Sequence, residues 1–186
     1  MQPQLQSVVD EIAAIRGRFA RLSNGTPDDR WSARSRPDAW SVAECVAHLN
    51  LTARAIQPLL DRASANARSL GAPARRLKRS VFGAILGAMV GPAPGWGNVR
   101  FGRTKTPPPF VPNGDLPRAE LVAEFERHLA AHEAALRAAD GLALDKVTIE
   151  SPFVAGANYD AYSAWIVVVR HAQRHLAQAE RVWRTG

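Results

Sequence analysis

The feature of the sequence that most constrains its fold is the spacing of its apolar residues, which repeats every three or four positions over four long segments. These segments cover residues 5–22, 41–60, 117–140 and 159–184. Such spacing places the apolar side chains on one face of an α-helix, and that face has to be buried against another element. No stretch has a convincing strand pattern. The spacing therefore predicts an all-α fold, a four-helix bundle whose ligand sites lie between facing helices.

The second of these segments begins with a recognisable capping signal. Ser41 can accept a hydrogen bond from the exposed amides of the first turn, and Glu44 can reach back to the Ser41 amide, which together make a capping box. This interpretation gives Glu44 a structural role. The alternative is that Glu44 supports His48, one turn further along the same helix.

The middle of the chain is less regular than the four segments. Residues 74–89 could form another amphipathic or buried helix, although its glycines lower its stability. Glycine and proline are dense from residue 91 to residue 117. We interpret this stretch as a long Pro/Gly-rich loop or lid before the third long helix, and we expect the three prolines at 107–109 to be extended.

Length and composition limit the class of protein. A chain of 186 residues, 46% of them hydrophobic, can bury one sizeable core, so we expect a single domain over residues 1–186. A single cysteine excludes an internal disulfide framework. The first residues lack a secretory signal, and the longest apolar stretch, residues 81–91, is shorter than the roughly 20 residues that span a bilayer. These features predict a cytoplasmic protein without a membrane partner.

The formal net charge of +7 raises the question of an acidic partner. Two local concentrations of basic residues stand out, at Arg75, Arg76, Lys78 and Arg79 and at Arg100, Arg103 and Lys105. Neither has interleaved aromatic residues for base stacking or a recognisable recognition helix. We therefore expect no specific nucleic-acid partner and attribute the charge to arginines scattered over polar helix faces.

Three histidines have the spacing and placement of metal ligands. His171 and His175 are four residues apart, so their imidazoles lie one turn apart on the same helix face and can reach one point beside the helix. Such a pair is also common as two solvated surface residues. A third ligand distinguishes the two interpretations, and His48 can supply it from the second segment. Three protein nitrogens would leave coordination positions open to water or substrate, as a catalytic metal site requires.

Five further residues have structural and functional interpretations side by side. His128 and His132 repeat the four-residue spacing, and His132 falls within an apolar stripe, where a buried structural histidine is more common than a proton-transfer group. Gln178 could hydrogen-bond a bound ligand, but such a glutamine more often lies at the surface or supports a metal ligand. We expect Arg174 on a solvated face and Cys45 packed and inert.

Two stretches resemble signatures of a known superfamily. Residues 40–49, Trp-Ser-Val-Ala-Glu-Cys-Val-Ala-His-Leu, are similar to the helix-two signature of the DinB/YfiT-like superfamily. Residues 171–178, His-Ala-Gln-Arg-His-Leu-Ala-Gln, resemble its C-terminal histidine pair followed by glutamine. The similarity covers essentially the whole chain and is weakest over residues 68–117. It implies a four-helix bundle that holds a divalent metal ion, nickel or zinc, on His48, His171 and His175.

The resemblance implies a metal-dependent enzyme, although activities in the superfamily diverge. Some members resemble hydrolases, and others resemble transferases or isomerases that use low-molecular-weight thiols such as bacillithiol, mycothiol or glutathione. A divalent ion can lower the pKa of a water or of a substrate thiol, which suits both chemistries. We expect a small-molecule substrate, a homodimer, and no residue dedicated to an organic cofactor. The alternatives are a stress-linked binding or structural bundle without turnover and, less favoured, a basic nucleic-acid-associated protein.

Overall fold

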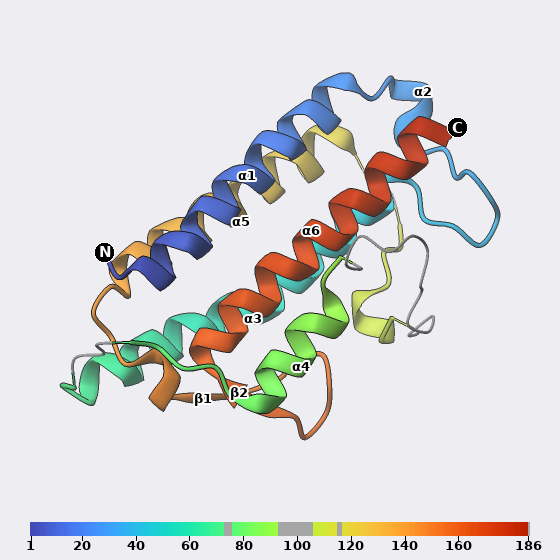
Figure 1. The fold of residues 1–186 in the computed structure, drawn as a ribbon. Helices are drawn as coiled ribbons and strands as arrows, with labels where there is room; N and C mark the ends of the chain where they lie inside the picture. Colours follow the sequence, from blue (N-terminus) through green and yellow to red (C-terminus); the bar gives the residue numbers. More distant parts are fainter. Residues whose placement is uncertain (73–75, 93–105, 115–116, 186) are drawn as a thin grey trace.

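The computed structural model describes residues 1–72, 76–92, 106–114 and 117–185, and over these residues the chain is mostly helical, as the apolar spacing predicted (Figure 1). Its four long helices are α1 (Pro3–Gly25), α3 (Val42–Ser69), α5 (Arg118–Ala138) and α6 (Ala161–Thr185). Two shorter α-helices are α2 (Asp28–Trp31) and α4 (Val81–Val90). Short 3-10 turns occur at η1 (Pro108–Phe110) and η2 (Leu144–Lys146), and two strands at β1 (Thr148–Glu150) and β2 (Asn158–Asp160).

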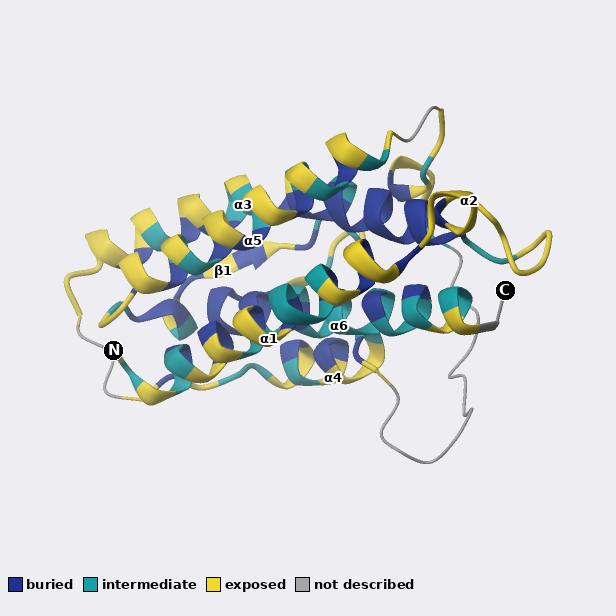
Figure 2. Ribbon diagram, turned by 90° about the horizontal axis from the view of Figure 1, so that it is seen from above, coloured by how far each residue is buried: buried dark blue, intermediate teal, exposed yellow. Residues whose placement is uncertain are grey.

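The four long helices lie side by side and enclose the core. Both α1 and α3 pack against α5 and α6. Figure 2 shows that the helices turn buried faces toward one another and exposed faces outward. Burying one large apolar side chain stabilises a fold by roughly 1.5–3 kcal/mol relative to leaving it exposed. The largest fully buried apolar side chains are Leu5, Ile12, Ile15, Phe19, Leu22, Ile56, Leu60, Leu136, Leu144, Trp165 and Leu176.

The start of α3 has the capping box that the sequence predicted. Ser41 Oγ accepts a hydrogen bond from the Glu44 amide at 3.1 Å, and Glu44 Oε2 accepts one from the Ser41 amide at 2.8 Å. Arg34 donates to both carboxylate oxygens of Glu44. Both carboxylate oxygens of Glu44 are therefore engaged in hydrogen bonds at the start of α3, one turn before His48. These bonds confirm the structural role of Glu44.

The helix α4 packs closely on α6. A Cβ atom at Gly83 would lie 2.3 Å from Cβ of Ser163, so only glycine permits this approach. This helix begins at Val81, later than the expected start at residue 74, and residues 73–75 lie outside the described part of the chain. No described helix is both long enough and apolar enough to cross a membrane.

The segment before α6 contains strands that the sequence did not indicate. β1 and β2 pair antiparallel, with Ile149 opposite Tyr159 and both side chains buried. Strands of three residues are too short to show the alternation that identifies a strand. The last helix therefore begins at Ala161, two residues later than expected, and Asp160 Oδ1 accepts a hydrogen bond from the Ser163 amide at 2.7 Å in its first turn.

The expected extended proline run is only partly extended. Pro107 is extended, with φ −57° and ψ 141°, but Pro108–Phe110 form the 3-10 turn η1. The fixed φ of proline is compatible with both conformations, so the sequence could not decide between them. The other parts of the expected loop, residues 93–105 and 115–116, lie outside the described residues.

Candidate metal centre

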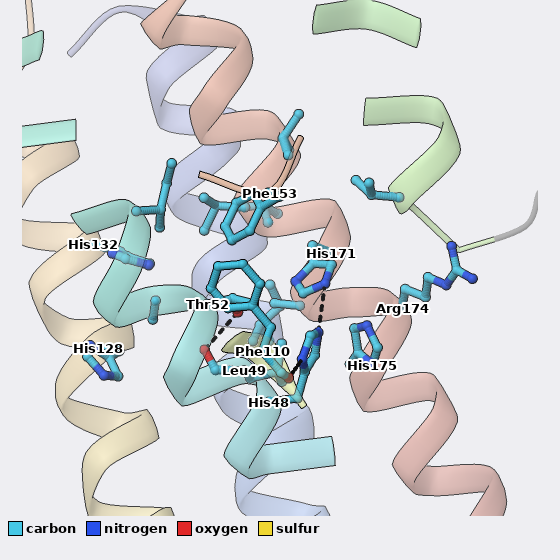
Figure 3. Close-up of a pocket in the computed structure, with 18 of the residues that line it drawn as sticks. His48, Leu49, Thr52, Phe110, His128, His132, Phe153, His171, Arg174 and His175 are labelled. Atoms are coloured by element: carbon cyan, nitrogen blue, oxygen red, sulfur yellow. Dashed lines mark hydrogen bonds between the residues drawn. The ribbon is translucent and has the colours of Figure 1, made fainter. Parts of the chain in front are cut away.

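The three histidines that the sequence singled out meet between α3 and α6 (Figure 3). Nε2 of His48 lies 3.2 Å from Nε2 of His171, and each of the three side chains offers one ligand atom within 4.8 Å of the others. The ring centroids are 4.4 to 5.0 Å apart. Neither His128 nor His132 belongs to this cluster, which brings together one residue of α3 and two of α6.

The spacing of the nitrogens fits a shared divalent ion. Two nitrogens that each bind one tetrahedral zinc ion at about 2.0–2.1 Å lie about 3.4 Å apart. The observed 3.2 Å between His48 and His171 is close to that value. In addition, Nδ1 of His175 is buried and has no hydrogen-bond partner among the described residues, so this ring has a nitrogen to offer. The cluster is therefore compatible with a divalent metal ion.

A backbone carbonyl fixes the orientation of His48. Nδ1 of this ring lies 2.7 Å from the carbonyl oxygen of Phe110 in a buried contact. A carbonyl oxygen only accepts hydrogen bonds, so Nδ1 carries the proton and Nε2 keeps its lone pair. This is the arrangement expected of a metal-ligating histidine, whose second nitrogen donates to a neighbouring oxygen. The 3-10 turn η1 positions this carbonyl.

The surroundings keep all three imidazoles neutral. Burial lowers the pKa of His48, and the Phe110 hydrogen bond opposes this only in part. Burial, aided by the neighbouring His48 and Arg174, lowers the pKa of His171 to about 3. Burial and the other two histidines likewise lower the pKa of His175 well below its ordinary value, while Gln178 acts in the opposite direction. Neutral imidazoles are the form that binds a metal ion.

Three aromatic residues form the walls of the cluster. Trp40 packs against His48 at 4.9 Å and against His175 at 5.8 Å between ring centroids. The ring of Phe153 lies 6.4 Å from His171 and nearly parallel to it, and Phe110 packs edge-on against Phe153. Sequence analysis missed the contacts of all three residues. Trp40 stands in the same motif as His48, but Phe110 and Phe153 lie in irregular segments where no periodic signal marks them.

The histidine cluster lies at the wall of a cavity of about 550 Å³. Most of the lining side chains are apolar and come from all four long helices, α4 and η1. His128 and His132 also line this cavity, and Figure 3 shows them on the side away from His171 and His175. A volume of this size is within the range of small-molecule sites.

The other candidate residues have mainly structural surroundings. Burial raises the pKa of the Cys45 thiol to about 12, which agrees with a packed, inert cysteine. The partner of His128 is the Glu124 carboxylate, one turn earlier at 3.2 Å. Arg174 is not simply a solvated face residue, because it lines the cavity and donates to the Met89 carbonyl at 3.0 Å. The side chain of Gln178 raises the pKa of His175 through a hydrogen bond, as expected of a residue that supports a ligand.

The fold and the site together define a mostly helical protein with a three-histidine cluster beside a small-molecule-sized cavity. The family model described as the DinB superfamily matches residues 11–179. The chain therefore belongs to the DinB superfamily, as its two sequence motifs indicated. The comparisons with curated proteins and with solved structures found no match.

Proposed function

We propose that this chain is a divalent-metal-dependent enzyme, either a hydrolase or a low-molecular-weight-thiol transferase, built as a single DinB-like four-helix-bundle domain. One observation carries the proposal: three neutral imidazoles from two helices meet at the wall of a cavity that can hold a small molecule. A purely structural metal site would be closed by protein ligands, whereas three histidines leave a position for substrate.

The proposed metal ligands are His48, His171 and His175. Imidazole nitrogens suit both nickel and zinc, so either ion is consistent with this donor set. When bound there, the ion would act as a Lewis acid and lower the pKa of a water or thiol at its open position.

The protein's own residues orient and shield the site. The Phe110 carbonyl holds the proton of His48 on Nδ1 and so directs Nε2 toward the other two histidines. Trp40 and Phe153 pack against the imidazole rings and restrict their rotation. The apolar lining of the cavity favours a substrate with a substantial apolar part.

The two alternative functions have less support. A bundle without turnover would be expected to have no cavity open to small molecules, and the cavity beside His171 weighs against it. Of the basic concentrations, Arg75, Arg100, Arg103 and Lys105 lie outside the described residues. The guanidinium of Arg79 donates to backbone carbonyls of α4 instead of facing a partner. A cytoplasmic location and a homodimer remain parts of the proposal.

Metal analysis tests this proposal directly. The protein is purified without a metal-affinity tag, offered zinc or nickel, dialysed and analysed for metal, alongside His48→Ala and His171→Ala. We expect about one equivalent of metal in the parent protein and loss of it in both variants. His128→Ala is the matched control, because this histidine lines the same cavity outside the cluster and should leave the metal content unchanged.

Absence of metal uptake would contradict the proposal. If the folded parent protein takes up no zinc and no nickel, the three histidines are packing residues and the enzyme proposal fails. If one equivalent is bound, hydrolytic and thiol-transfer substrates can be screened against the metal-loaded protein and the His48→Ala variant in parallel.

A further inference from the structure

The cavity contains a second polar position, on the side away from the three-histidine cluster. His132 of α5 lines the cavity and is only 4% exposed. Its Nδ1 is hydrogen-bonded to Oε1 of Gln57 on α3. Figure 3 shows that the rings of His132 and of His171 lie on opposite sides of the cavity. Two different helices thus hold a polar pair in mainly apolar surroundings.

The hydrogen bonds around Gln57 decide which nitrogen of His132 carries the proton. The side-chain amide of Gln57 donates through Nε2 to Oδ1 of Asp61 at 2.7 Å, so Oε1 is the atom that faces His132. This oxygen only accepts, and Nδ1 of His132 must therefore carry the proton. The remaining nitrogen, Nε2, keeps its lone pair. Trp165 packs edge-on against the ring, with centroids 5.5 Å apart, and holds its plane.

His132 is suited to accept a hydrogen bond rather than to transfer a proton. Burial, with a smaller contribution from His128, lowers the pKa of His132 to about 4, so the ring stays neutral around neutral pH. A neutral ring with its lone pair on Nε2 accepts a hydrogen bond but has no second proton to give. The ligand group that suits Nε2 of His132 is a neutral hydrogen-bond donor, because an ammonium group would be costly to bury among apolar side chains.

The two polar positions are separated by an apolar stretch. Positions 48 and 57 are about 13 Å apart along α3 at its rise per residue. Between them, Leu49, Ala53 and Ile56 line the cavity, together with Thr52, whose hydroxyl donates to the Leu49 carbonyl at 3.0 Å. A ligand that reaches from the cluster to His132 therefore needs an apolar middle of comparable length.

We propose that the cavity binds an elongated substrate with its reacting group at the three-histidine cluster, an apolar middle, and a neutral hydroxyl or amide N–H at the far end that donates to Nε2 of His132. This inference rests on the proposed function, because it takes the cluster as the reacting end. It names the substrate class of that site and makes His132 a specificity-determining residue.

Binding to the zinc-loaded protein tests the inference. The probes are ω-hydroxyalkanethiols of increasing chain length and alkanethiols with the same number of heavy atoms, and affinities are measured by titration calorimetry. The thiol anchors each probe at the cluster, so the pairs differ only at the far end. At the chain length that reaches His132, the wild type should prefer the hydroxyl probe about five- to tenfold, the effect of one hydrogen bond in an apolar site.

Variants separate the role of His132 from general effects on the cavity. His132→Phe keeps the ring volume against Trp165 and should abolish the preference. If it does not fold, His132→Phe combined with Gln57→Leu leaves no unpaired amide and makes the same test. His128→Leu changes the other histidine of α5 that lines the cavity and should keep the preference.

The outcomes distinguish this inference from the proposed function. If both probe series bind but never differ, or if His132→Phe keeps the preference, His132 is a structural residue and the inference is wrong, while the metal site stands. If neither series binds to the zinc-loaded protein, the inference and the thiol-transferase form of the proposed function both fail, while the hydrolase form stands; absence of zinc and nickel uptake would sink both forms. In His48→Ala, which should lose the metal, the thiol has no anchor, so both series should lose affinity alike.

Discussion

The pH dependence of stability should report on the buried state of His132. Its pKa is about 4 in the folded protein, against an ordinary value of 6.5, chiefly because burial disfavours the charged ring. Between these pH values the unfolded chain binds more protons than the folded protein. The part of the free energy of unfolding that comes from keeping His132 neutral is therefore intact above pH 6.5 and is lost progressively as the pH falls toward 4. The full effect is about 3 kcal/mol, of which about 1 kcal/mol is lost between pH 7.5 and pH 5.5.

Urea denaturation of the metal-free protein in that pH range measures this loss. The protein is made metal-free with a chelator, which excludes any contribution from metal release to the pH dependence. The His132→Phe variant lacks the titrating ring and serves as the reference. As the pH falls from 7.5 to 5.5, the free energy of unfolding of the wild type should fall by about 1 kcal/mol relative to that of the variant. Leu129→Ala, a buried change on the same helix, should cost about 2–5 kcal/mol at every pH. A constant gap between the wild type and His132→Phe would show that the folded ring titrates like an exposed one and would refute the reasoning.

Three further perturbations test the fold around the site. Ser41→Ala removes the acceptor of the capping box and should cost about 1 kcal/mol of unfolding free energy in chemical denaturation, with the metal content unchanged. Cys45 should react with a disulfide reagent far more slowly in the native protein than in urea, because burial raises its pKa to about 12; fast native labelling would contradict its packing. Gly83→Ala should lower the melting temperature, because its Cβ would lie 2.3 Å from Cβ of Ser163, whereas Gly17→Ala, whose nearest contact is at 3.7 Å, should be neutral or stabilising.

The helices could be predicted because their signal is local and repeated. Four long amphipathic segments and the Ser41 capping box each depend on residues within a few turns of one another, and the structure has them. The β1–β2 hairpin could not be predicted, since its strands have three residues each. The turn at Pro108–Phe110 was also missed, because proline sterics allow both an extended and a 3-10 conformation.

The candidate site was predictable to the level of residues but not of contacts. The four-residue spacing of His171 and His175 is a local signal, and the motif around His48 added the third side chain. The walls of the site come from Trp40, whose side-chain direction no local signal gives, and from Phe153 in the irregular segment before α6. These contacts depend on how distant segments pack, which helical periodicity does not encode.

Both ends of the cavity use the same device to set the chemistry of a histidine. The Phe110 carbonyl accepts a hydrogen bond from Nδ1 of His48, and Oε1 of Gln57 accepts one from Nδ1 of His132, so that each ring keeps a lone pair on Nε2. A buried neutral histidine can donate or accept through either nitrogen, and the oxygen beside it decides which. That oxygen lies 62 positions away for His48 and 75 for His132. The sequence therefore indicated the three histidines of the cluster, while tertiary packing determines which nitrogen of each ring keeps its lone pair, and the binding proposed at either end depends on that second choice.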